Sequence, residues 1–171
     1  MSRSVQAGSP LLLVAVACAV FAVDRASKVA VQQFVPLNGS YPVAGGIVHV
    51  SHTQNTGAAF SLAPALGNFF LLFAVAATIG IVYYYRRVPR AEVWTRVALG
   101  MVLGGALGNA LDRALVGSVT DFIDFRFWPV FNLADTCIVL GAAILVWRFT
   151  VQPRDDSVTE PDAAPAEGAD D

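Results

Sequence analysis

Two aspartates, Asp121 and Asp135, lie in surroundings that favour acid–base chemistry. Asp135 follows FNLA near the start of an apolar run, and no Lys or Arg follows it in that run until Arg148. Asp121 lies in VTDFID and also lacks a neighbouring cation, whereas Asp124 has Arg126 close by and is expected to be solvated or paired. Asp121 and Asp135 are therefore the candidates for carboxylates without a local ion-pair partner.

Two carboxylates held about 3 Å apart cannot both ionise, so they share one proton. The ionised partner can take a proton from water, and the protonated partner can donate a hydrogen bond to a scissile carbonyl. Such a pair hydrolyses a peptide without a metal or a covalent intermediate, and its two carboxyl groups titrate jointly. The spacing of Asp121 and Asp135 allows the two to meet but does not require it.

Asp24 and Lys28 form a second polar cluster, next to Arg25. A spacing of four residues places Asp24 and Lys28 on one helix face, where they can pair. We expect a structural ion pair near the outer interface that supports the site, with the Lys28 side chain extending towards water.

A third cluster, Asn109, Asp112 and Arg113, lies in the glycine-rich segment GGALGNALDR. The three residues share one helix face, and the glycines let another helix approach closely. We expect Asp112 and Arg113 to neutralise each other at a helix end.

Asn55 and Gly57 in NTGAAF, and Asn132 one turn before Asp135, complete the polar set. Gly57 permits unusual backbone angles, and an asparagine amide both donates and accepts hydrogen bonds. NTGAAF is typical of a turn that dips into a membrane, which is compatible with a role in substrate binding.

The composition indicates a membrane protein. Of 171 residues, 56% are hydrophobic and 14% are charged, against about 45–50% and about 25% in soluble domains. A spanning helix needs roughly 20 apolar residues. We predict an all-α, four-transmembrane-helix bundle whose spans cover about 10–31, 69–85, 93–111 and 130–149.

The orientation follows from the arginines in the short loop RRVPR, namely Arg86, Arg87 and Arg90. Cytoplasmic loops are enriched in Lys and Arg, so both termini are predicted to be cytoplasmic. The two longer connections then face outward. The first contains GGIVHVSHTQN, whose alternation predicts a small β-sheet and loop on the extracytoplasmic face.

The chain divides into two parts of different composition. Residues 1–150 contain all four predicted spans and form one predicted domain, whereas residues 151–171 are acidic and rich in Ala and Pro. A segment with so little apolar surface to bury is expected to be a disordered, cytoplasmic tail.

The motifs DRASK, NTGAAF, GNALDR with VTDFID, and FNLAD, in this order, strongly resemble those of signal peptidase II, the lipoprotein signal peptidase. The resemblance covers about residues 10–150. It implies an aspartyl peptidase whose catalytic dyad is Asp121 and Asp135. It further implies that the site is lined or supported by Asn55, Asn109, Asp112, Arg113, Asn132, Asp24 and Lys28.

The resemblance also implies the substrate, a diacylglyceryl-modified prolipoprotein that is cut just before its lipid-bearing cysteine. The enzyme would need no cofactor or metal and would work as a monomer in the bacterial cell membrane, in contact with membrane lipids. The basic residues do not gather into a stripe interleaved with aromatics, so no nucleic-acid partner is expected.

Two other classes of function remain open on the residues alone. A small transporter or proton channel also holds aspartates in the membrane, but it predicts polar residues at every depth, whereas 69–85 has only Thr78 before its tyrosines. A metal-dependent lipid-headgroup enzyme would need three or more carboxylates on facing helices and would be inhibited by chelators. His49 and His52 lack ligand partners at suitable spacing and are expected to be surface loop residues.

Overall fold

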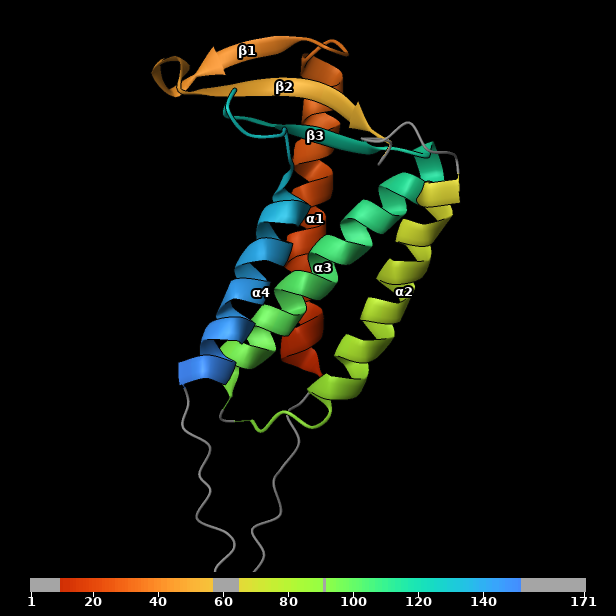
Figure 1. Ribbon diagram of the computed structural model, residues 1–171, viewed down its shortest axis with the longest axis vertical. Coiled ribbons are helices and arrows are strands. Elements are labelled where there is room, and N and C mark those ends of the chain that lie inside the picture. The colour runs from red at the N-terminus through yellow and green to blue at the C-terminus, as the bar shows by residue number, and fades with distance from the viewer. Residues whose placement is uncertain (1–9, 57–64, 91, 152–171) are drawn as a thin grey trace, which may run out of the picture.

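Helices dominate the chain. The computed structural model describes residues 10–56, 65–90 and 92–151 (Figure 1). Within them the helices are α1 (Leu11–Phe34), α2 (Ala65–Tyr85), α3 (Val93–Val116) and α4 (Leu133–Val151). They run side by side as an elongated bundle with a sheet at one end, and α1 begins and α4 ends at the opposite end (Figure 1).

The predicted helices are all present, with ends that differ by a few residues. The largest difference is in α3, which continues past the predicted residue 111 to Val116. Gly117 then ends the helix in the left-handed conformation (φ 78°), and its N–H donates to Arg113 O at 3.0 Å. Among the described residues, α3 and α4 are long and apolar enough to cross a membrane.

The sheet has three antiparallel strands in the order β1-β2-β3. Their bounds are Ser40–Val43 for β1, Val48–Asn55 for β2 and Val119–Asp124 for β3, and a short 3-10 turn, η1 (Ala44–Gly46), joins β1 to β2. The strand expected from the alternation in GGIVHVSHTQN is confirmed as β2. The third strand was not predicted, because Val119, Thr120, Asp121 and Phe122 are all buried and leave no polar–apolar alternation to read.

The two histidines lie in β2 and not in a loop, so the prediction of surface loop residues is wrong. His52 is buried at 6% exposure, and its Nδ1 lies 2.8 Å from Val35 O at the end of α1. The contact joins the sheet to the helix beneath it.

Helix α3 packs against each of the other three helices, and its glycines make the approach close. A Cβ added at Gly104 would lie 2.6 Å from Ala17 O of α1, and one added at Gly105 would lie 2.5 Å from Ala134 O of α4. At Gly108 the added atom would meet Asp24 Oδ2 at 2.6 Å. The short glycine surface therefore lets α1 and α4 bring their polar groups against α3.

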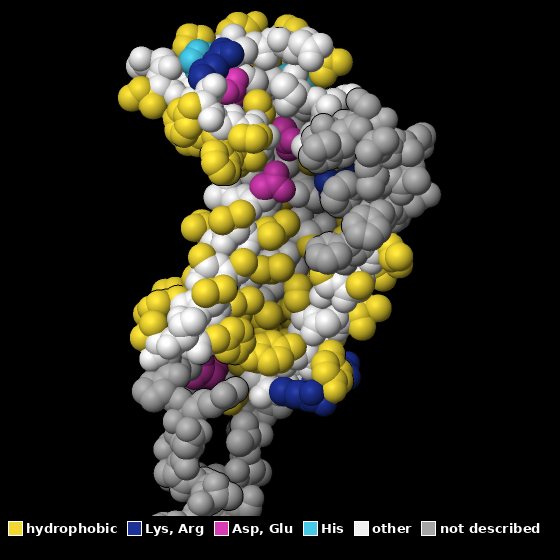
Figure 2. All heavy atoms as spheres, viewed as in Figure 1, with side chains coloured by type: hydrophobic (Ala, Val, Ile, Leu, Met, Phe, Trp, Pro, Cys, Tyr) yellow, Lys and Arg dark blue, Asp and Glu magenta, His cyan; other side chains and the backbone are white. Residues whose placement is uncertain are grey.

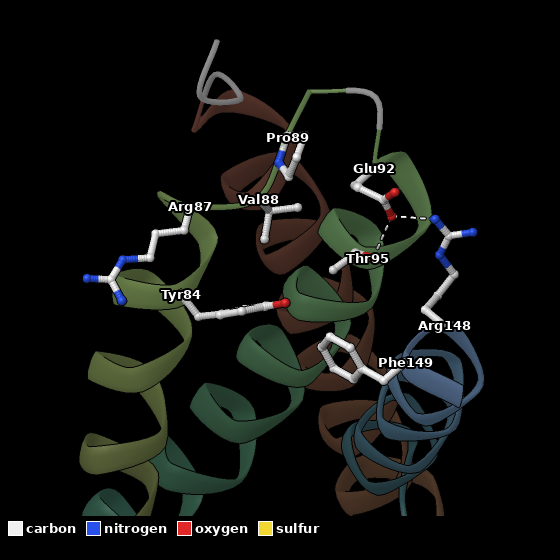
Figure 3. Close-up of a pocket in the computed structure, with 8 residues that line it drawn as sticks. All are labelled: Tyr84, Arg87, Val88, Pro89, Glu92, Thr95, Arg148 and Phe149. Atoms are coloured by element: carbon white, nitrogen blue, oxygen red, sulfur yellow. Dashed lines mark hydrogen bonds and ion pairs between the residues drawn. The ribbon is translucent and has the colours of Figure 1, made fainter. Parts of the chain in front are cut away.

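The helix ends far from the sheet are joined by polar contacts around a cavity of about 280 Å³ (Figure 3). Glu92 forms an ion pair with Arg148 of α4 and accepts a hydrogen bond from Thr95 Oγ1 at 3.1 Å. Nearby, buried Arg96 donates to the Tyr85 hydroxyl through Nε at 3.0 Å and Nη2 at 2.8 Å. These contacts hold α2, α3 and α4 together at this end.

The glycine packing generates a prediction. Gly104→Ala should destabilise the bundle by roughly 1–3 kcal/mol, because its Cβ would overlap backbone atoms of α1 that cannot move alone. Gly80→Ala in α2 is the matched control, because nothing lies within 4 Å of the added atom. That control should be neutral or gain up to about 1 kcal/mol of helix propensity. Thermal unfolding in detergent measures both, and equal stability of the two variants would contradict the packing.

Candidate active site

The structure brings the two predicted aspartates to one side chain, Asn132, where the sheet meets the helices. Asn132 Nδ2 donates to Asp121 Oδ1 at 2.7 Å, and Asn132 Oδ1 accepts the backbone N–H of Asp135 at 2.9 Å. Asp121 is carried by β3 and Asp135 by the first turn of α4. Acidic side chains are visible at this junction, above a largely hydrophobic helix surface (Figure 2).

The FNLAD motif builds the start of α4. Asn132 precedes the helix and caps the N–H of Asp135, while Asp135 Oδ2 accepts the N–H of Asn132 at 3.3 Å. This reciprocal pattern is a capping box, which satisfies helix donors that have no intrahelical partner. Asp24 Oδ1 accepts a further N–H, that of Ala134, at 2.9 Å. The spacing N-x-x-D is therefore the sequence signal for this helix start.

Asn109 of α3 connects the aspartates to the charges of α1. Its Nδ2 donates to Asp135 Oδ1 at 2.7 Å. Its Oδ1 accepts from Asn132 Nδ2 at 3.2 Å and from Lys28 Nζ at 2.9 Å. The predicted site residues Lys28, Asn109, Asn132 and Asp135 thus form one continuous hydrogen-bonded chain.

Asn55, at the end of β2, completes the shell around Asp121. Its Nδ2 donates to Asp121 Oδ2 at 3.0 Å, and Thr53 Oγ1 on the same strand donates to the backbone carbonyl of Asp121 at 3.2 Å. Asn55 is therefore placed where the sequence predicted a site residue. Gly57, the other residue predicted in that motif, lies outside the described residues.

The ion pair predicted within α1 is confirmed, but its setting differs from the prediction. Lys28 Nζ lies 2.8 Å from Asp24 Oδ2 and 2.9 Å from Asp112 Oδ2. Lys28 and Asp24 are both 0% exposed. The expected extension of Lys28 towards water is wrong, because its carboxylate partners lie inside the bundle.

Asp112 is neutralised from α1, whereas the sequence pointed to the next residue, Arg113, as its partner. Arg25 forms an ion pair with Asp112 Oδ1, and Lys28 binds the other oxygen. One turn of α3 separates Asp112 from Asn109, so the pairing fixes the height of α1 against the site. The sequence did not identify Arg25 as a site residue, because no local pattern places α1 against α3.

Arg113 lines the same cavity as Asp135 and does not form an ion pair with Asp112. Its Nη1 reaches the Asn109 carbonyl at 3.4 Å. Arg113, Asn109 and Asp135 line a cavity of about 220 Å³ between α2, α3 and α4. The rest of its wall is apolar and includes the small side chains Ala74, Ala77 and Ala106. The cavity therefore offers a carboxylate, an amide and a cation at one end of an apolar groove.

Burial perturbs the Asp121 carboxyl group. Asp121 is 3% exposed, and burial raises its pKa from 3.8 to about 6. Hydrogen bonds from Asn55 and Asn132 oppose this rise, and the neighbouring negative charge of Asp135 adds to it. A raised pKa favours the protonated form, so Asp121 keeps its proton up to about pH 6, well above the pH at which an ordinary aspartate loses it.

Asp124, three residues along β3, behaves in the opposite way. The backbone N–H of Arg126 donates to Asp124 Oδ1 at 2.7 Å, and Ser51 Oγ donates to Oδ2 at 2.8 Å. These hydrogen bonds lower the pKa of the Asp124 carboxyl group. The Arg126 guanidinium lies 3.6 Å away, which confirms the predicted pairing.

Metal chemistry requires a cluster of donor side chains. Within the described residues, no group of three or more His, Cys, Asp and Glu side chains is arranged to hold a metal ion. The donor set of the metal-dependent alternative is not found in this part of the chain.

Comparison with known proteins gives one consistent family. The family model described as "Signal peptidase (SPase) II" matches residues 16–151. A lipoprotein signal peptidase of Moorella thermoacetica is 41% identical over 152 residues, which cover 89% of this chain and 99% of that protein. One of Desulfitobacterium hafniense is 39% identical over 82% of this chain and 94% of its own. One of Pelotomaculum thermopropionicum is 44% identical over 80% and 90%.

The fold also matches a solved structure. A bacterial membrane enzyme, determined by the in meso method at 1.9 Å resolution, superposes with a TM-score of 0.80. The match covers 88% of this chain and all of that chain at 24% identity, so it supports the fold alone. Since the family model spans residues 16–151 and the relatives are 39–44% identical over most of their length, this chain belongs to the signal peptidase II family.

Proposed function

We propose that Asp121 and Asp135 are the catalytic dyad with which this enzyme removes signal peptides from diacylglyceryl-modified prolipoproteins, cutting before the lipidated cysteine. Membership of the family supports the reaction and the kind of substrate. The observation that carries the residue assignment is the shared asparagine. Asn132 binds Asp121 through its amide and the start of the Asp135 helix through its oxygen.

The surroundings of the two aspartates divide the roles of base and acid. Asp135 lines the cavity between α2, α3 and α4 and lies in the first turn of α4, where aligned peptide dipoles favour a negative charge. It is therefore the base that activates water. Asp121 is almost fully buried and has a raised pKa, so it is the acid that faces the scissile carbonyl.

Hydrolysis then needs no covalent intermediate. The water oxygen bonds to the scissile carbon as its proton moves to Asp135, and the Asp121 proton moves to the carbonyl oxygen. When the tetrahedral intermediate collapses, Asp135 returns its proton to the leaving nitrogen. Asp121 recovers a proton from the hydroxyl that becomes the new carboxyl group. Each aspartate ends in its initial protonation state.

The bundle dimensions support four membrane crossings. The helices contain 24, 21, 24 and 19 residues, which at 1.5 Å per residue span about 29–36 Å, close to the roughly 30 Å hydrocarbon thickness. Arg86, Arg87 and Arg90 lie at the end of the bundle remote from the sheet. We place that end and both termini in the cytoplasm, which puts the sheet and the dyad at the outer surface.

The cavity supports lateral entry of the substrate. Its small alanines leave room beside α2 and α3, where the transmembrane signal peptide of a lipid-anchored precursor would arrive from the bilayer. Phe127 and Trp128, next to the sheet, are 82% and 64% exposed and suit the membrane interface. In this proposal a monomer is sufficient and residues 1–150 form the enzyme. The predicted disordered tail, residues 151–171, lies outside the described residues except for Val151.

The dyad assignment predicts that Asp121→Asn and Asp135→Asn each lower cleavage of a lipidated precursor by roughly 10³–10⁴-fold, because each removes one proton-transfer group. Mass spectrometry of the purified reaction detects the released signal peptide. Asp124→Asn is the matched control, because Asp124 lies on the same strand but is hydrogen-bonded to Ser51 and Arg126. It should retain most of the activity.

Cleavage by either dyad variant at the wild-type rate would remove the assignment. The reaction should also continue in EDTA, and its loss there would move the assignment to metal-assisted hydrolysis.

The perturbed carboxyl groups predict opposite pH effects on stability. The folded-state pKa of Asp121 is raised from 3.8 to about 6. The contribution of its proton to the free energy of unfolding is therefore complete below pH 3.8 and is lost as the pH rises to about 6. Asp121→Asn should therefore gain stability relative to the wild type between about pH 4 and 6, by at most about 3 kcal/mol, and level off above.

Asp124 provides the comparison of opposite sign. Its pKa is lowered, so its charge stabilises the fold above the unfolded-state pKa, and Asp124→Asn should lose stability relative to the wild type as the pH rises. Melting temperatures in detergent at pH 4, 5, 6 and 7.5 give both trends. Parallel trends for the two variants would show that burial does not govern the Asp121 carboxyl group.

A further inference from the structure

We infer that Lys28 is a positioning residue for the reaction: its ammonium fixes the orientation of the Asn109 amide and thereby keeps a hydrogen-bond donor on Asp135. This inference rests on the proposed role of Asp135 as the base. Lys28 is 0% exposed, so it acts through Asn109 and does not touch the substrate.

The orientation of Asn109 follows from what its neighbours can donate and accept. An asparagine amide has similar shape in two orientations, with its oxygen and nitrogen exchanged. A lysine ammonium has three donors and no acceptor, so the Asn109 atom that lies 2.9 Å from Lys28 Nζ must be the oxygen. The nitrogen must then face Asp135 Oδ1, at 2.7 Å.

The second neighbour of the Asn109 oxygen holds it less firmly. Asn132 Nδ2 lies 3.2 Å from Asn109 Oδ1 and also donates to Asp121 Oδ1 at the shorter distance of 2.7 Å. Asn132 is itself oriented by the fixed N–H of Asp135, which its oxygen accepts. Among the described residues, Lys28 is thus the only charged donor to the Asn109 side-chain oxygen, and without it only Asn132 and Asp135 hold the amide in this orientation.

A reversed Asn109 amide would change the chemistry of the dyad. Its oxygen would then face the Asp135 carboxylate, and two acceptors in contact favour a proton between them. Asp135 would hold that proton and could no longer take one from water. The orientation set by Lys28 therefore keeps a donor, and not an acceptor, against the carboxylate that takes the proton from water in the proposed mechanism.

Stability alone does not account for a buried lysine at this position. Ion pairs buried in this way often add little net stability, because desolvation offsets the attraction. Asp112 already has Arg25 as a partner, and Asp24 already accepts the N–H of Ala134. Among the described residues, Lys28 is the only cation that pairs with Asp24 and the only one that donates to the Asn109 side-chain oxygen.

A double-mutant cycle between Lys28 and Asn109 tests the inference. Lys28→Met alone would leave Asp24 without a cation, so all variants carry Asp24→Asn, and Asp112 keeps Arg25. With Asn109 present, Lys28→Met should lower kcat for a lipidated precursor by roughly 10–100-fold and leave KM unchanged. In the variant that also carries Asn109→Ala, the same change should alter kcat by less than about twofold, because the amide it orients is gone.

Arg25→Met is the matched control. Arg25 binds the same Asp112 from the same helix and makes no hydrogen bond to Asn109, so its effect on kcat should be equal with and without Asn109→Ala. An equal effect of Lys28→Met in both backgrounds would overturn the inference. Asp121→Asn and Asp135→Asn, assayed in parallel, separate this result from the proposed function. If both variants are inactive, the dyad assignment is supported whatever the result of the double-mutant cycle.

Discussion

A lysine ammonium buried inside a membrane-embedded bundle is the constraint on which the site depends. Such a charge is stable only with close partners, since its uncompensated burial costs several kcal/mol. Lys28 forms ion pairs with Asp24 of its own helix and with Asp112 of α3, and it donates a hydrogen bond to Asn109 of α3. These contacts require α1 and α3 to lie almost backbone to backbone, which Gly104 and Gly108 permit. The charge cluster and the glycine surface therefore determine one helix arrangement together.

The amide side chains of Asn109 and Asn132 connect this charge cluster to the two aspartates. Asn109 and Asn132 each use both ends of the amide: both nitrogens donate to a carboxylate oxygen, and both oxygens accept a hydrogen bond. A buried network with all its members satisfied is rigid, and a partly satisfied one is unstable. The two aspartates therefore receive fixed donors before any substrate arrives. Their unequal burial supports the proposed division of roles, in which Asp121 is the acid and Asp135 the base.

The sequence predicted the parts of the fold that follow from local patterns. Long apolar runs gave the helices, the alternation around His49 gave β2, and the spacing of Asp24 and Lys28 gave their ion pair. Contacts between distant segments were beyond such patterns. Nothing local pairs Asp112 with Arg25, and the burial of both faces of β3 removes its alternation. The meeting of Asp121 and Asp135 became an expectation only through the ordered motifs of a family.

The sheet has a mechanical consequence for the enzyme. Asp121 belongs to strand β3 and Asp135 to helix α4. Asn132, which lies between the strand and the helix, is hydrogen-bonded to both residues. The bridge from Ile123 to Phe131 clamps the same corner. The distance between the two carboxylates therefore depends on the position of the sheet relative to the end of α4. A tilt of the sheet would change the distance between the two proposed catalytic carboxylates, so the proposed mechanism requires this corner to be rigid.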